Sequence, residues 1–196
     1  MPADRAEPTA VDVALRVAGA IEGAGGAYFV GGSLASSLQG EPRATNDVDI
    51  VMELPLGRTQ QFVEALGADF EVDVDALRAA LLAGASCNIF FLPCLTKVDL
   101  FAAGSSPYDE MEFSRRRPVV VREPDVRLVV KSPEDTVLRK LWWFREGGEV
   151  SERQFRDVVQ VLRFSGEGMD QEYLELWART LRVADLLERA REAAMK

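Results

Sequence analysis

Two acidic residues separated by one position, Asp47 and Asp49, lie in the apolar segment DVDIVME. In a β-strand alternate side chains face the same way, so both carboxylates project together while Val48 and Ile50 enter the core. Two carboxylates held side by side repel each other unless a proton or a cation lies between them. Mg²⁺ prefers oxygen ligands and commonly shares its coordination shell with phosphates, so the pair predicts a magnesium site.

A third acid, Asp99, occurs in the segment TKVDLF, where it shares a face with Lys97. A carboxylate pair on one strand and a single acid on a neighbouring strand can hold two metal ions. One ion then binds a triphosphate, and the other activates an attacking hydroxyl. The chain contains no histidine, so Asp99 is the predicted general base. The predicted catalytic and metal-binding residues are Asp47, Asp49 and Asp99.

A glycine-rich turn, Gly31-Gly32-Ser33, follows the apolar run Ala27–Val30 and precedes a short predicted helix, residues 34–38. Such a turn offers free backbone N–H groups to phosphate oxygens. Glycine permits close approach of the backbone, and the Ser33 hydroxyl can donate a further hydrogen bond. These three residues are therefore predicted to bind the phosphates of a nucleotide.

Each of these features has a plainer explanation when it is taken alone. A Gly-Gly pair is most often only a turn, an Asp-x-Asp pair usually lies at the surface, and an acid such as Asp99 is usually solvated or salt-bridged. The sequence combines all three in one order, with thirteen residues between Ser33 and Asp47. That combination favours phosphate and metal chemistry over three unrelated features.

The composition excludes several other kinds of site. Without histidine, the chain of 196 residues can form neither a Ser-His-Asp nor a Cys-His nucleophile pair, nor a zinc or iron site with histidine ligands. Its two cysteines cannot complete a structural zinc site, and they are typical of a reducing cytosol. The N-terminal segment MPADRAEPTA has no apolar signal core, and no run is long enough to span a membrane. The predicted location is cytoplasmic, with no membrane partner.

The charge is distributed unevenly along the chain, which has a formal net charge of −9. Residues 1–110 hold 6 basic and 16 acidic residues, a net charge of −10, whereas residues 111–196 hold 17 and 16, a net charge of +1. An acidic front half and an arginine-rich rear half suit a metal site that faces an anion-binding wall. Solvated helix faces explain most of these charges in any case.

The elements that must position these residues follow from the hydrophobic pattern and the turn signals. We expect an α/β (α+β) fold with a small mixed sheet in residues 1–130, followed by a helical subdomain in residues 131–196 that closes the cleft. The expected strands are residues 27–30, 47–53, 88–92, 96–101, 117–121 and 127–130, the last two being candidate edge strands. The expected helices are residues 9–23, 34–38, 57–66, 75–83, 133–146 and 151–164, with one more from Asp170 to near the C-terminus.

The segment YFVGGSLASSLQGEPRATNDVDIV resembles the signature of the DNA polymerase β nucleotidyltransferase superfamily. Its G-x-x-R-x-T-x-D-[IV]-D form resembles a minimal bacterial branch near the AbiEii-type toxins, and the likeness extends over about residues 27–165. The resemblance implies that Asp47, Asp49 and Asp99 bind metal and that Gly32 and Ser33 hold the triphosphate. It also implies further nucleotide-binding residues in the helical half: Lys140, Arg153, Arg156 and Asp157.

Two of the cations permit more than one interpretation. Lys140 interrupts the apolar pattern of its helix, and its amine can reach an anion in a cleft or remain in water while its stem covers apolar surface. Arg43 precedes the acids, where it can bind phosphate or brace the loop. The aromatic run Trp142–Phe144 is expected in the core rather than as a platform for a nucleobase.

The function predicted from these features is Mg²⁺-dependent transfer of a nucleoside monophosphate from an NTP to an acceptor hydroxyl or phosphate. The resemblance to toxin-type relatives and the basic residues 112–163 favour RNA as the acceptor, and the resemblance adds an antitoxin protein as a partner. Two alternatives stay open at this point. One is a small-molecule nucleotidyltransferase of the antibiotic-modifying kind, and the other is a non-catalytic interaction protein that retains the fold.

Overall fold

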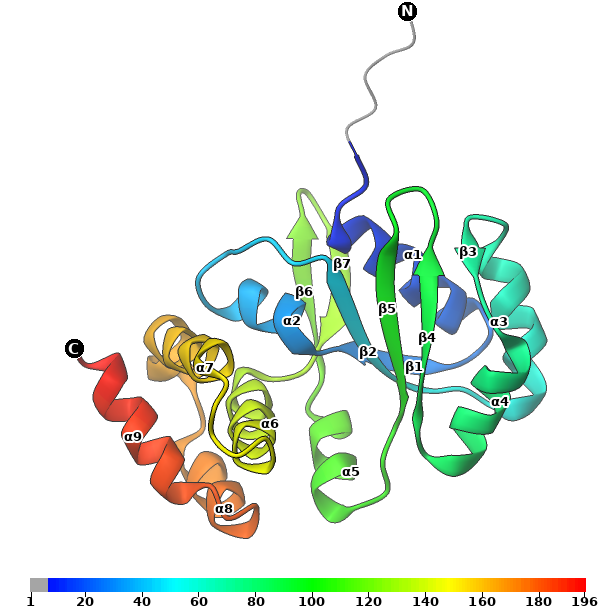
Figure 1. Cartoon of the computed structure of the whole chain (residues 1–196). Coiled ribbons are helices and arrows are strands. Elements are labelled where there is room, and N and C mark those ends of the chain that lie inside the picture. Colours follow the sequence, from blue (N-terminus) through cyan, green and yellow to red (C-terminus); the bar gives the residue numbers. More distant parts are fainter. Residues whose placement is uncertain (1–6) are drawn as a thin grey trace, which may run out of the picture.

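The computed structural model describes residues 7–196, so most of the N-terminal segment in which no signal core was found lies outside the described residues. A seven-stranded mixed sheet forms its centre, with strand order β3-β4-β5-β2-β1-β7-β6 (Figure 1). Strand β1 pairs antiparallel with β2 and parallel with β7, and β2 pairs parallel with β5. The strands are β1 (Ala27–Val30), β2 (Asp47–Glu53), β3 (Phe70–Glu71), β4 (Ser86–Phe91), β5 (Thr96–Ala102), β6 (Arg117–Arg122) and β7 (Val126–Val130).

Nine α-helices occur within residues 7–196, and seven of them form two groups in space (Figure 1). Helices α6–α9 lie together on one side of the molecule, and α1, α3 and α4 lie against the sheet. The helices are α1 (Ala10–Gly23), α2 (Gly32–Gln39), α3 (Thr59–Leu66), α4 (Val74–Ala83), α5 (Pro107–Ser114), α6 (Pro133–Glu146), α7 (Glu152–Ser165), α8 (Gln171–Thr180) and α9 (Ala184–Ala194). This arrangement confirms the predicted mixed α/β fold with a helical C-terminal part.

Two hydrophobic clusters stabilise the two parts of the chain. The first joins one face of the sheet to α1, α3 and α4, and it includes Val17, Phe62, Ile50 and Leu100. The second lies among α6–α9 and includes Leu138 of α6. Because side chains alternate along β2, the pattern that buries Val48, Ile50 and Met52 leaves Asp47, Asp49 and Val51 on the opposite face of the sheet. That opposite face is free to line a site.

Most predicted elements agree with the structure, and the differences have local causes. The single helix expected after Asp170 is broken into α8 and α9, because Arg182 adopts a left-handed backbone with φ of 59°. Of the two strands predicted as candidate edge strands, β7 lies inside the sheet and β6 forms one of its edges. Two elements were not predicted, the two-residue strand β3 and helix α5. Helix α5 has a readable start, since Ser106 and Asp109 form a capping box with Pro107 at the first turn.

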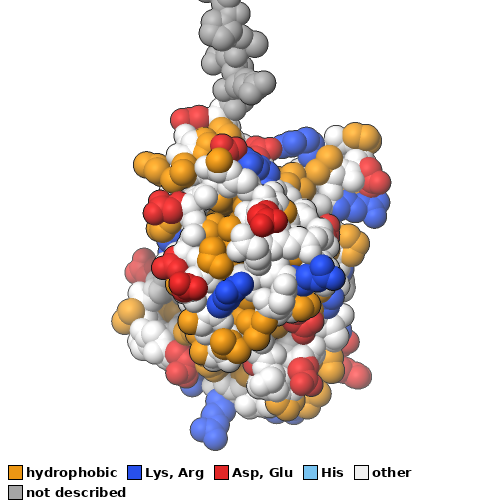
Figure 2. Space-filling view, turned by 90° about the vertical axis from the view of Figure 1, so that its right-hand side faces the viewer, with side chains coloured by type: hydrophobic (Ala, Val, Ile, Leu, Met, Phe, Trp, Pro, Cys, Tyr) orange, Lys and Arg blue, Asp and Glu red, His pale blue; other side chains and the backbone are white. Residues whose placement is uncertain are grey.

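The surface that carries α3 and α4 shows no separation of charge. In Figure 2, which views this side of the molecule, acidic and basic side chains are scattered among apolar ones. Its basic side chains therefore form no continuous patch for a polyanion on this face.

No helix within residues 7–196 is both long enough and apolar enough to cross a bilayer.

Candidate active site

The predicted site residues meet where four central strands of the sheet come together. Strands β1 and β7 run parallel, and each leads directly into a helix, β1 into α2 and β7 into α6. Strand β2 runs the other way beside β1, and the Gly31 N–H donates a hydrogen bond to the Asp49 carbonyl at 2.8 Å. In the parallel pair β2 and β5, Asp49 lies opposite Asp99 and Asp47 lies opposite Lys97. The topology thus brings the glycine turn and the three acids together.

A cleft of about 720 Å³ opens on the face of the sheet that carries these acids. One wall consists of the glycine turn and strands β2 and β5, and the other of helices α5, α6 and α7. Nine of the predicted residues line it: Gly31, Gly32, Ser33, Asp47, Asp49, Asp99, Lys140, Arg153 and Asp157. Arg43 and Arg156 do not line this cleft. The residues assembled along it come from segments more than 100 positions apart in the sequence.

The carboxylates in the cleft are crowded. Burial raises the pKa of Asp49 above its usual value, and the charges of Asp99 and Asp47 raise it further. The ammonium groups of Lys131 and Lys140 act in the opposite direction. Asp99 is paired with Lys97 through an Nζ–Oδ2 contact of 2.8 Å. The acids therefore lie close enough for their charges to interact, as a cation site between them requires.

The donor set fits a hard divalent cation in chemistry, since it consists of carboxylate oxygens alone. Within residues 7–196, no three Asp, Glu, His or Cys side chains are gathered into a ready metal site. The pairing of Asp99 with Lys97 directs one of the three carboxylates to an ammonium group. Asp47 and Asp49, on one strand, and Asp99, beside them, remain the residues that would hold the metal.

Gly32 is required by the close packing of the turn against Asp49. It has a φ of +54°, which side chains rarely adopt, and a Cβ atom placed on it would lie 1.7 Å from the Asp49 Oδ2. The first turn of α2 and the carboxylate therefore occupy adjoining space only because this residue has no side chain. Gly31 precedes it as the N-cap of α2 and, having no side chain, makes no side-chain hydrogen bond to the start of that helix.

Ser33 and Asp157 link the glycine turn to the helical half. The Ser33 hydroxyl accepts hydrogen bonds from Arg43 at 2.9 Å and from Arg153 at 3.3 Å. Asp157 binds both Arg43 and Lys140, with nitrogen–oxygen distances of 2.9 Å in each case. Arg43 thus braces the site from outside the cleft, which is one of the two roles considered for it. Lys140 is held inside the cleft by its ion pair.

Asp157 is ionised despite its burial. Burial by itself raises the pKa of this carboxyl, but the hydrogen bond from Arg43 and the charge of Lys140 outweigh it and lower the pKa below 3.8. For Lys140, burial lowers the pKa of the ammonium and Asp157 acts against that effect. The side chains of Asp157 and Lys140 are 9% and 12% exposed, so solvent screens this ion pair only weakly.

Replacing Asp157 with Asn is expected to lower the free energy of unfolding by about 2 kcal/mol or more, because it leaves two cations without their counter-charge. The wild-type ion pairs contribute at pH values above 3.8, the usual pKa of Asp, and are lost as the pH falls through the lower pKa of folded Asp157. The difference between variant and wild type should therefore shrink in acid. Urea unfolding at pH 7 and pH 3 measures it.

Asp185 provides the matched control for that variant. It pairs with Arg145 at 2.7 Å, but its side chain is 71% exposed. Exposed ion pairs of this kind contribute little, so Asp185→Asn should change the free energy of unfolding by less than about 1 kcal/mol. Equal losses in the two variants would mean that Asp157 has no special structural role.

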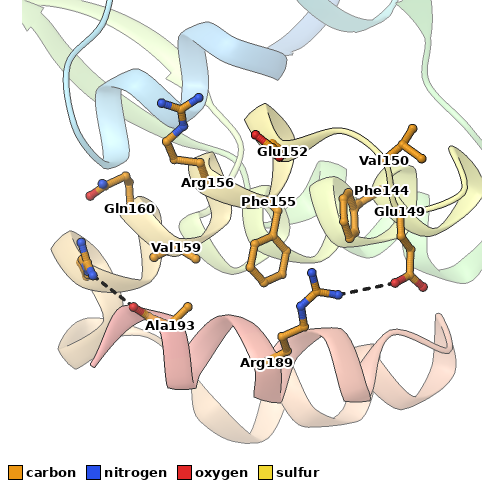
Figure 3. Close-up of a pocket in the computed structure, with 11 residues that line it drawn as sticks. Phe144, Glu149, Val150, Glu152, Phe155, Arg156, Val159, Gln160, Arg189 and Ala193 are labelled. Atoms are coloured by element: carbon orange, nitrogen blue, oxygen red, sulfur yellow. Dashed lines mark hydrogen bonds and ion pairs between the residues drawn. The ribbon is translucent and has the colours of Figure 1, made fainter. Parts of the chain in front are cut away.

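Arg156 lies outside the cleft, in a smaller pocket that it lines together with Arg43, Arg153 and Asp157. It also lines a second cavity of about 530 Å³ between α7 and α9, shown in Figure 3. There Phe155 points toward α9, and Arg189 lies over its ring and pairs with Glu149 at 3.7 Å. On α7, Arg156 and Asp157 follow Arg153 by three and four residues, so the three side chains are neighbours and share the smaller pocket, while Arg156 also borders the cavity beside α9.

Sequence reasoning missed several side chains of the cleft. Lys131 lies at the end of β7, and its ammonium binds Glu112 of α5 at 2.9 Å. Arg139 of α6 binds the same Glu112 and also Asp109, the latter at 2.7 Å. Lys131 could have been noticed as the one charged residue between an apolar strand and the helix start at Ser132. The acids on α5 could not, because that helix was not predicted.

The aromatic run of α6 agrees only in part with the expectation of a core position. Phe144 is buried in the core and Trp142 is half-buried against it, but Trp142 and Trp143 both line the cleft, and Trp143 is exposed. Their ring centroids are 4.7 Å apart in an edge-on arrangement, and Trp143 is 51% exposed. An α-helix turns by about 100° per residue, so three consecutive aromatic residues cannot all face the same core. The cleft therefore has an aromatic wall beside its charged one.

Comparison with solved structures identifies proteins of similar fold. The solution structure of the antibiotic-resistance factor ANT(2'')-Ia, described with substrate-regulated conformation dynamics, matches with a TM-score of 0.51 and 14% identity over 96% of both chains. A crystal structure of ANT(2'')-Ia in complex with adenylyl-2''-tobramycin matches with a TM-score of 0.50 and 13% identity, over 88% of this chain and 97% of that one. No protein-family model and no curated protein matches the chain. The chain therefore shares the fold of ANT(2'')-Ia, a mixed sheet followed by a helical part.

Proposed function

We propose that this protein is a Mg²⁺-dependent nucleotidyltransferase of the DNA polymerase β type. The observation that carries the proposal is the meeting of the Gly31–Ser33 turn with Asp47, Asp49 and Asp99 in one cleft. The fold shared with ANT(2'')-Ia, which has been crystallised with an adenylylated antibiotic, is in keeping with it. We further propose that residues 131–196 act as the subdomain that closes this cleft over an NTP.

In the proposed reaction an acceptor oxygen bonds to the α-phosphorus of the NTP. The bond from that phosphorus to the bridging oxygen breaks, and pyrophosphate leaves with its electron pair. Asp99 accepts the proton of the acceptor hydroxyl, while Lys97 holds this carboxylate in place. The backbone N–H groups of Gly32 and Ser33 orient the triphosphate at the start of α2. Two Mg²⁺ ions, held by Asp47, Asp49 and Asp99, would neutralise the phosphate charge.

RNA is the proposed acceptor. Arg153, Arg156 and Arg163 are exposed along α7, beginning at the cleft and continuing away from it. Such a row supplies positive charge to a phosphate backbone without reading its sequence. Within the cleft, Asp109, Glu112 and Asp157 are each paired with a basic side chain. The acids outside the three predicted catalytic ones therefore offer little net charge to a polycationic acceptor.

An aminoglycoside antibiotic is the second candidate acceptor. The similarity of fold to ANT(2'')-Ia, an antibiotic-resistance factor, favours it specifically. The cleft, at about 720 Å³, lies within the range of sites that bind small molecules. The resemblance to AbiEii-type toxins belongs with the first candidate: if RNA is the acceptor, we also propose an antitoxin protein as a partner.

One labelling experiment tests the function and separates the acceptors. The protein is incubated with Mg²⁺ and each α-³²P NTP in turn, together with total bacterial RNA, a protein lysate or a panel of aminoglycosides. Label on RNA that is lost in Asp49→Asn supports the proposal. Label on aminoglycosides alone assigns the second acceptor. No label in any pool and no binding of Mg²⁺-NTP would leave a non-catalytic interaction protein as the explanation.

A further inference from the structure

Lys131 occupies an unusual position for a charged residue. It follows the last residue of β7 and precedes Ser132, the N-cap of α6. Its side chain is only 7% exposed. Its Cε would lie 3.3 Å, and its Nζ 3.7 Å, from a Cβ atom built on Gly31. The ammonium group is therefore buried beside the glycine turn, and it also lines the cleft.

The ion pair with Glu112 does not by itself account for this lysine. Glu112 is also bound by Arg139, which contacts both of its carboxylate oxygens. The carboxylate thus already has one full positive partner. Within residues 7–196 the Lys131 ammonium donates a single side-chain hydrogen bond, to Glu112 at 2.9 Å. An ammonium has three protons, so two remain for a ligand in the cleft.

The backbone around Lys131 adds further positive potential. Gly31 is the N-cap of α2 and Ser132 is the N-cap of α6, and the parallel strands β1 and β7 place these two helix starts side by side. A helix N-terminus carries a partial positive charge, so a buried cation next to two of them is unfavourably placed. An anion bound at this point would relieve that repulsion.

We propose that Lys131 is a phosphate-binding residue that, with Lys140, grips the triphosphate of the NTP in the cleft. The assignment rests on the proposed function and adds to it a contact that neither the glycine turn nor the three acids supply. Both lysines line the cleft and lie near Asp49, where each acts on the pKa of that carboxyl. Lys131 also lowers the pKa of Lys140, and both side chains border the same cleft.

The test measures binding in the absence of chemistry. Isothermal titration calorimetry with ATP, and separately with inorganic tripolyphosphate, is carried out without Mg²⁺ on the wild type and four single variants. Binding of each NTP to the wild type is also measured with Mg²⁺. Lys131→Met keeps the length of the stem and removes the charge, and it should weaken both affinities by roughly tenfold or more. Lys131→Arg keeps a positive charge and should retain most of the affinity. Lys140→Met should lose affinity to a similar extent.

Glu112→Gln is the matched control, because it removes the partner of Lys131 while leaving the ammonium in place. Its affinity for ATP should equal or exceed that of the wild type. If Lys131→Met fails to fold, Lys131→Met/Glu112→Gln removes both charges together and takes its place, with the same loss of affinity expected.

Three results would contradict the role proposed for Lys131 or the proposed function. Normal affinity in Lys131→Met, with reduced affinity in Lys140→Met, would overturn the role of Lys131 and leave the proposed function intact. Loss of affinity in Glu112→Gln equal to that in Lys131→Met would assign the ion pair a structural role only. Failure of the wild type to bind any NTP, with or without Mg²⁺, would overturn the proposed function itself.

Discussion

Replacing Asp49 with Asn is expected to reduce nucleotidyl transfer by at least about a thousand-fold, because it removes a charged ligand at the centre of the proposed metal site. The same variant should lose the rise in melting temperature that Mg²⁺ and a non-hydrolysable NTP give the wild type. A ligand that binds only the folded state stabilises it according to its concentration and affinity, so the thermal shift measures binding directly.

The stability of the metal-free Asp49→Asn protein should be equal to or greater than that of the wild type. The carboxylate is half-buried beside Asp47 and Asp99, and an uncharged amide of the same shape removes their repulsion. Asp125 serves as the control, since it lies in the hairpin between β6 and β7 with a side chain 68% exposed. Asp125→Asn should leave transfer and thermal shift unchanged. Transfer at the wild-type rate in Asp49→Asn would place the reaction elsewhere.

The second large effect is expected at Gly32. In Gly32→Ala the new Cβ would lie 1.7 Å from Oδ2 and 2.4 Å from Cγ of Asp49, so the carboxylate or the turn must move. We expect transfer to fall by about a hundred-fold or more, because a displaced reacting group loses most of its advantage of position. Single-turnover rates and the affinity for Mg²⁺-NTP would show the loss.

The variant Gly25→Ala is the control that separates the steric conflict with Asp49 from the cost of placing alanine in a left-handed backbone conformation. Gly25 has a φ of +74°, similar to that of Gly32, but a Cβ at Gly25 meets nothing within 4 Å. Gly25→Ala should therefore show only the cost of a left-handed backbone, about 1–2 kcal/mol of stability, with normal transfer. The excess loss in Gly32→Ala measures the conflict with Asp49. Normal transfer in Gly32→Ala would show that the turn and the carboxylate can separate without consequence.

The elements that hold the predicted acids could be read from the sequence because their signals are local. Strand β2 has the predicted bounds, residues 47–53, since its apolar and polar residues alternate without interruption. Helix α6 starts after Ser132 as predicted, where Ser132 accepts a hydrogen bond from the Asp135 N–H. The pairing of β4 with β5 follows from two short apolar runs joined by a tight turn.

The partners of the charged side chains could not be read in the same way, because they depend on contacts between distant segments. Asp157 meets Arg43 across 114 positions, and Lys131 meets Glu112 through a helix that was not predicted. For the same reason the sequence pattern could not show that Arg153 lines the main cleft whereas Arg156, three residues further along α7, lies outside it. Local patterns determine elements, whereas the ionic network follows from how those elements pack.

The aromatic wall of the cleft gives the protein an optical property. The chain has three tryptophans, and two of them, Trp142 and Trp143, line the cleft. The third, Trp177, packs against Tyr108 in the helical part. Indole emission depends on the polarity around the ring and is quenched by a stacked base. Because two of the three tryptophans line the proposed nucleotide site, a bound nucleotide should change the intrinsic fluorescence of this protein, which can be followed without any added dye.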